Sequence, residues 1–88
     1  MPTLGVLGNI DIAIYFDDTK KHRRPHFHAI GPDRDAVIAI PELEVIEGSL
    51  RSKEIRVVKD WASNNLEWLI VDWNRCNPQM TIASKRES

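Results

Sequence analysis

This sequence has few of the features that mark secreted, membrane-bound or disulfide-rich proteins. Its single cysteine, Cys76, cannot form a disulfide within the chain, and a lone cysteine is typical of a reducing compartment. No apolar run approaches the ~20 residues that a membrane-spanning helix needs. No cationic segment precedes the apolar residues of positions 1–8, so the start of the chain does not resemble a secretory signal. We therefore expect a cytoplasmic protein with no membrane partner.

A large excess of charge of either sign is also lacking. The formal net charge is −1, so any affinity for nucleic acid must come from a local basic patch rather than from the whole surface. The length of 88 residues allows one compact domain. We place this α+β domain at residues 1–78 and expect the polar residues 79–88 to form a frayed tail.

Hydrophobic patterning divides the chain into a first half of strands and a second half of helices. Apolar and polar residues alternate between turn residues and predict strands over residues 10–17, 26–30, 35–40 and 42–47. In the first of these, the Ile side chains and Phe16 are expected on the core face. Helical spacing predicts two helices within residues 49–77, with a break at Asn64 and Asn65. This order favours a small antiparallel sheet of three to four strands followed by two C-terminal helices packed on one face.

Two histidines flank a phenylalanine at the start of the second predicted strand. Because His26 and His28 are two positions apart, a strand places both rings on one side, ~6–7 Å apart. Such a pair can offer one proton acceptor and one proton donor near neutral pH. A hairpin would bring the non-core face of the preceding strand beside this pair. The candidate catalytic residues are therefore His26, His28, Tyr15 and Asp17.

A basic segment directly precedes the histidine pair. Residues 20–24 are all cationic or titratable and form a local patch that attracts phosphate groups. The candidate nucleic-acid contacts are Lys20, Lys21, Arg23 and Arg24. The basic patch and the histidine pair together fit RNA cleavage. In that reaction one histidine takes the 2′-hydroxyl proton and the other protonates the leaving oxygen. Because the 2′-hydroxyl is itself the nucleophile, this reaction requires no metal and no other cofactor.

Two other interpretations of the same residues stay open. In one, the chain is a non-enzymatic module whose basic loop binds nucleic acid or an acidic protein, and the histidines are structural. In the other, His26 and His28 hold a metal ion. The candidates for the third ligand are Asp17, Asp18 and His22.

The chain resembles a family of small bacterial proteins that share a domain of unknown function. The resemblance rests on Pro-His-Phe-His-Ala at residues 25–29, the start Met1-Pro2-Thr3, the acidic pair Asp17-Asp18, Gly48-Ser49-Leu50, Trp61-Ala62 and Trp73. Family members are commonly encoded beside a second small domain, in pairs that look like toxin–antitoxin modules. The resemblance implies a toxin-like component of a type II toxin–antitoxin module. It also implies a cognate antitoxin-like protein as partner and RNA as a target.

Overall fold

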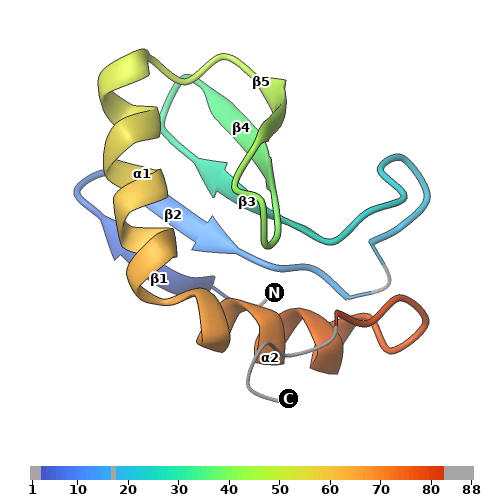
Figure 1. Ribbon diagram of the computed structural model, residues 1–88. Helices are drawn as coiled ribbons and strands as arrows, with labels where there is room; N and C mark the ends of the chain where they lie inside the picture. Colours follow the sequence, from blue (N-terminus) through green and yellow to red (C-terminus); the bar gives the residue numbers. More distant parts are fainter. Residues whose placement is uncertain (1–2, 17, 83–88) are drawn as a thin grey trace.

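The computed structural model describes residues 3–16 and 18–82, which form one antiparallel sheet of five strands and two helices (Figure 1). The strands lie in the sheet in sequence order: β1 (Thr3–Leu7), β2 (Ile10–Ala13), β3 (His26–Ile30), β4 (Asp35–Ala39) and β5 (Val45–Gly48). They are followed by α1 (Ser52–Asn64) and α2 (Leu66–Cys76). Within these described residues, no helix is long and apolar enough to cross a membrane.

The predicted α+β class is confirmed, but the predicted count of three to four strands is wrong. The strand that the patterning missed is β1, which pairs with β2 across a turn that holds Gly8 at φ 64°. Gly5 interrupts the apolar residues of β1, which weakens the alternation. A Cβ at Gly5 would lie 3.3 Å from the Trp61 ring, so this position lets α1 approach the strand closely.

The core lies between the sheet and the helices, and β2 supplies much of it. Ile10, Ile12 and Ile14 are buried, as the alternation predicted. Phe16 is 64% exposed, which contradicts its predicted place on the core face. The reason is that β2 ends at Ala13, so strand alternation no longer governs the residues that follow.

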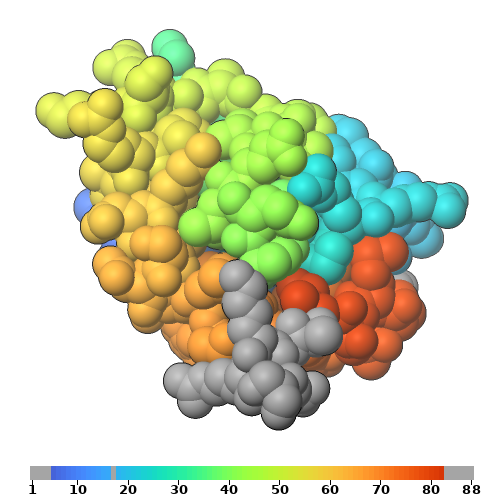
Figure 2. Space-filling view, in the orientation of Figure 1, coloured from blue at the N-terminus to red at the C-terminus, as the bar shows by residue number. Residues whose placement is uncertain are grey.

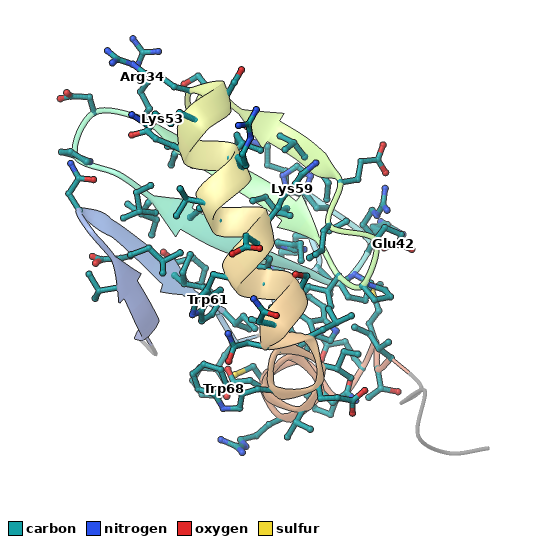
Figure 3. The ribbon with its side chains drawn as sticks, turned by 60° about the vertical axis from the view of Figure 1, so that its left-hand side comes forward. Arg34, Glu42, Lys53, Lys59, Trp61 and Trp68 are labelled. Carbon is teal, nitrogen blue, oxygen red and sulfur yellow. The ribbon has the colours of Figure 1, made fainter. Side chains whose placement is uncertain are left out.

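The break between the helices falls where the sequence predicted it. Asn65 closes α1, because its backbone N–H donates to the carbonyl of Ala62 and its side-chain amide donates to the carbonyl of Trp61. The rings of Trp61 and Trp68 meet edge to face at this junction, with centres 6.2 Å apart (Figure 3). As a result α1 covers one face of the sheet, whereas α2 crosses the end of the sheet beside the β2–β3 loop (Figure 1).

The chain beyond α2 stays in contact with that helix as far as Ile82. The indole Nε1 of Trp73 donates to the carbonyl of Met80 at 2.6 Å. Asn74 exchanges two hydrogen bonds with the backbone of Ile82, at 2.7 and 3.0 Å. Residues 83–88 of the predicted tail lie outside the described residues.

Candidate functional site

Asp18, His26 and His28 meet where the β2–β3 loop reaches the start of β3. Oδ2 of Asp18 lies 2.8 Å from Nε2 of His26 and 2.8 Å from Nε2 of His28. The two imidazole centres are 5.2 Å apart. One carboxylate oxygen therefore bridges the two histidines of the Pro-His-Phe-His-Ala segment, and we call these three residues the Asp–His–His cluster.

His26 is the buried member of the cluster. It is 1% exposed, and its ring packs against Trp73 with the ring centres 5.2 Å apart. Nδ1 of His26 lies 2.7 Å from the backbone carbonyl oxygen of Arg24. Because a carbonyl can only accept, Nδ1 carries a proton and donates it. This hydrogen bond fixes the ring and directs Nε2 at Asp18.

His28 and Asp18 are the accessible members, with side-chain exposures of 21% and 27%. Tyr15 packs edge-on against the His28 ring, with the ring centres 4.6 Å apart. Burial raises the pKa of Tyr15, and the negative charges of Asp18 and Asp35 raise it further. The phenol therefore keeps its proton and contributes packing to His28 rather than charge.

The carboxyl group of Asp18 is held in its ionised form. Burial raises its pKa, but the hydrogen bonds from His28 and His26 and their charges outweigh this effect, so the net pKa lies below the ordinary value. With His26 Nδ1 protonated, the Nε2 of a neutral ring would present a lone pair to this carboxylate at 2.8 Å. Two acceptors at that distance require a proton or a cation between them.

Asn77 positions Asp18, and sequence reasoning missed it. The Asn77 side chain is fully buried; its Oδ1 accepts from the backbone N–H of Asp18 at 2.7 Å, and its Nδ2 donates to the carbonyl of Tyr15 at 3.0 Å. These two hydrogen bonds join the end of α2 to Tyr15 and to Asp18 itself. The only signal in the sequence is an asparagine before Pro78 at the end of a helix, which is ordinary cap chemistry.

A cleft of ≈ 220 Å³ opens beside the cluster. Asp18 and His28 line it on one side, and Asp35 and Glu47 line it from β4 and β5. Lys21 and His22 reach it from the β2–β3 loop. Acidic and basic groups therefore face one another across the opening.

The predicted basic patch is divided by ion pairs. Lys21 Nζ lies 3.2 Å from Glu47, and His22 Nε2 lies 3.0 Å from the other oxygen of the same carboxylate. The guanidinium of Arg24 lies 3.4 Å from Glu42 and 3.4 Å from Glu44. In the space-filling view, loop atoms in cyan lie against the green segment that carries these glutamates (Figure 2). Lys20 and Arg23, the two remaining cations of this patch, form no ion pair within residues 3–16 and 18–82.

The predicted site residues are only partly brought together. The cluster joins His26 and His28, and Tyr15 contacts His28. Asp17 lies outside the described residues. The aspartate seen beside the histidines is Asp18, which the sequence offered only as a metal ligand. His22, another candidate ligand, pairs with Glu47 instead.

Fold and site together define a small α+β domain with an Asp–His–His cluster at one end of its sheet. The family described as "Domain of unknown function (DUF4160)" matches residues 9–74. The chain belongs to this family, and the matched range contains all three cluster residues. No curated protein and no solved structure matches this chain.

Proposed function

We propose that this protein is the toxin-like component of a bacterial type II toxin–antitoxin module and that it cleaves RNA in the cytoplasm. The observation that carries the proposal is the accessible Asp18–His28 pair at the mouth of a cleft. A carboxylate that orients an imidazole is a recurrent device for general-base catalysis. The toxin-like role and the antitoxin-like partner rest on the family resemblance.

In this proposal the two histidines have different roles. His28 donates its Nε2 proton to Asp18, so its Nδ1 is left as the proton acceptor. Nδ1 takes the 2′-hydroxyl proton while the 2′ oxygen bonds to phosphorus and the 5′ oxygen–phosphorus bond breaks. The leaving oxygen takes a proton from water, and the resulting hydroxide is neutralised by His28. His26 is buried and cannot reach RNA, so it holds Asp18 in place rather than acting as the second acid–base group.

In this proposal the RNA backbone is bound by the two cations of the β2–β3 loop that form no ion pair within the described residues. Lys20 and Arg23 are exposed on the loop that leads to the cluster, whereas Lys21 and Arg24 are engaged by glutamates. Exposed cations beside the cleft bring phosphates to His28 without requiring a basic surface overall. This limits the proposed contact to a short length of RNA.

The test is controlled expression of the protein in bacteria without its partner. The wild type is expected to stop growth and to shorten cellular RNA, because no antitoxin-like protein is present to block the Asp18–His28 site. His28→Ala is expected to restore growth, since a general base contributes roughly 100-fold or more to such a reaction. A matched variant, Lys53→Ala on the exposed surface of α1 (Figure 3), should stay toxic.

Equal toxicity of the wild type and His28→Ala, or no toxicity in either, would contradict the proposal. Melting curves of each purified variant show whether the fold is intact. RNA binding that weakens steeply with salt but yields no cleavage product would instead establish the non-enzymatic binding module.

A further inference from the structure

We infer that Asp18, His26 and His28 form a binding site for one divalent transition-metal ion. Each residue offers one ligand atom, and the three atoms lie within 4.8 Å of one another. The three atoms are Oδ2 of Asp18 and the Nε2 atoms of the two histidines. Both nitrogens lie 2.8 Å from the same carboxylate oxygen, so the three atoms converge as the ligands of one ion do.

The distances fit an ion with short bonds. A transition metal binds imidazole nitrogen at ~2.0–2.1 Å, so neighbouring ligands on such an ion lie ~3 Å apart. The carboxylate oxygen is 2.8 Å from each nitrogen. Small rotations of Asp18 and His28, the two partly exposed side chains, would bring all three atoms to bonding distance without moving the buried ring.

The groups behind the ligands also fit a metal site. Histidines that bind metal usually donate their other ring N–H to a carbonyl or carboxylate, which fixes the ring. His26 does this through Nδ1 and the carbonyl of Arg24, at 2.7 Å. Asp18 is held through its backbone by Asn77, at 2.7 Å. Partly buried hydrogen bonds therefore hold two of the three ligands, His26 and Asp18, in place.

The surroundings leave a cation a route in. The cleft beside the cluster carries the carboxylate of Asp35 in addition to that of Asp18, whereas Glu47 on the same cleft is paired with Lys21 and His22. Because Asp18 and His28 line this cleft, water or a substrate oxygen can complete the coordination from that side. Two nitrogens and one oxygen select ions such as Zn²⁺ and Co²⁺ over Mg²⁺ and Ca²⁺, which prefer oxygen ligands.

An ion at this site changes the chemistry of His28. When Nε2 binds the metal, the ring proton moves to Nδ1, so His28 no longer offers the proton acceptor that RNA cleavage uses. The metal is therefore an inhibitor of the proposed reaction, and this consequence rests on the proposed function. The binding site itself does not depend on it.

The binding test uses the whole purified chain, stripped with a chelator and titrated with Zn²⁺ by calorimetry. One Zn²⁺ per chain is expected, and Co²⁺ is expected to give visible absorption bands from nitrogen and oxygen ligands. His28→Ala and Asp18→Asn should weaken Zn²⁺ binding at least ~100-fold. This is more than the loss of a group that only hydrogen-bonds to a ligand would cause. His22→Ala is the matched control; the His22 ring packs edge-on against His26, with ring centres 5.4 Å apart, but its Nε2 pairs with Glu47, so its loss should weaken binding by no more than about tenfold.

The site is overturned if the folded wild type binds no Zn²⁺, if Mg²⁺ binds as tightly, or if His22→Ala weakens binding as much as His28→Ala. The inhibitory role is measured on RNA cleavage by the purified protein. Saturating Zn²⁺ should slow it ~100-fold, the size of the lost general base, and a chelator should restore it. Faster cleavage with Zn²⁺ would contradict the inhibitory role. Zn²⁺ binding without toxicity in cells would contradict the proposed function and leave the site standing.

Discussion

At the scale of single residues, the chemistry depends on which aspartate faces the histidines. The sequence could show that His26 and His28 share a strand and that acidic residues precede them. It favours Asp17, because a strand that continues through Asp17 places this residue on the same face as Tyr15. β2 ends at Ala13, so the alternation no longer decides which aspartate is near, and Asp18 contacts both rings. The side chains of a loop are set by contacts with distant residues, which no local pattern records.

Asn77 makes the contact that positions Asp18, and replacing it should disturb the Asp–His–His cluster. In Asn77→Ala the backbone N–H of Asp18 and the carbonyl of Tyr15 lose their buried partner, at a cost of about 1–3 kcal/mol in the free energy of unfolding. We expect Zn²⁺ affinity to fall by about 10–100-fold in the protein that remains folded. Asn64→Ala, which removes only an exposed hydrogen bond to the Asp60 carbonyl, is the control. Unchanged Zn²⁺ affinity in Asn77→Ala would mean that Asn77 supports the fold alone.

At the scale of elements, segments with an unbroken periodic pattern were predictable, whereas a strand whose pattern is interrupted by glycine was not. The strand over residues 26–30 and both helices follow from periodicity, because each presents an apolar face to the core. β1 was missed because Gly5 has no side chain and so interrupts the alternation. A glycine stands there because the Trp61 ring of α1 lies close to this position. β5 begins at Val45, later than the predicted residue 42. There Leu43 adopts φ 60°, a turn conformation that alternation of side chains does not reveal.

Gly48 ends β5 and should be the least replaceable glycine of the sheet. It has φ 124°, and a Cβ there would overlap the backbone of Ala36 and the carbonyl of Asp35 on β4. Gly48→Ala is expected to lower the free energy of unfolding by about 3 kcal/mol, because strain and overlap act together. Gly8→Ala, with φ 64° and no atom within 4 Å of the added Cβ, should cost only about 1 kcal/mol. Urea unfolding measures both, and equal midpoints for the two variants would refute the overlap.

At the scale of the whole molecule, the order of strands and helices was predictable but the path of α2 was not. Its placement across the sheet end depends on the turn at Asn65 and on hydrogen bonds between Asn77 and residues about 60 positions earlier. The same path brings Trp73 against His26 and so buries one member of the cluster. The sequence could therefore indicate the histidine pair, whereas the difference between a buried and an accessible histidine arises only in the folded chain.

The charge of the whole molecule predicts how RNA binding should respond to salt. With a net charge of −1, binding must arise from a local group of cations, and we expect it at Lys20 and Arg23, which are exposed on the loop that leads to the cluster. Each phosphate contact adds about 0.7 to the slope of log affinity against log salt for single strands, so replacing both by alanine should reduce the slope by about 1.4. Replacing Lys53 and Arg56, exposed on α1, removes the same charge and should leave the slope unchanged. Equal reductions in both double variants would mean that RNA responds to total charge rather than to the loop beside the cleft. Fluorescence anisotropy of a labelled single-stranded RNA, measured at several salt concentrations with His28→Ala as the background to prevent cleavage, separates the two outcomes.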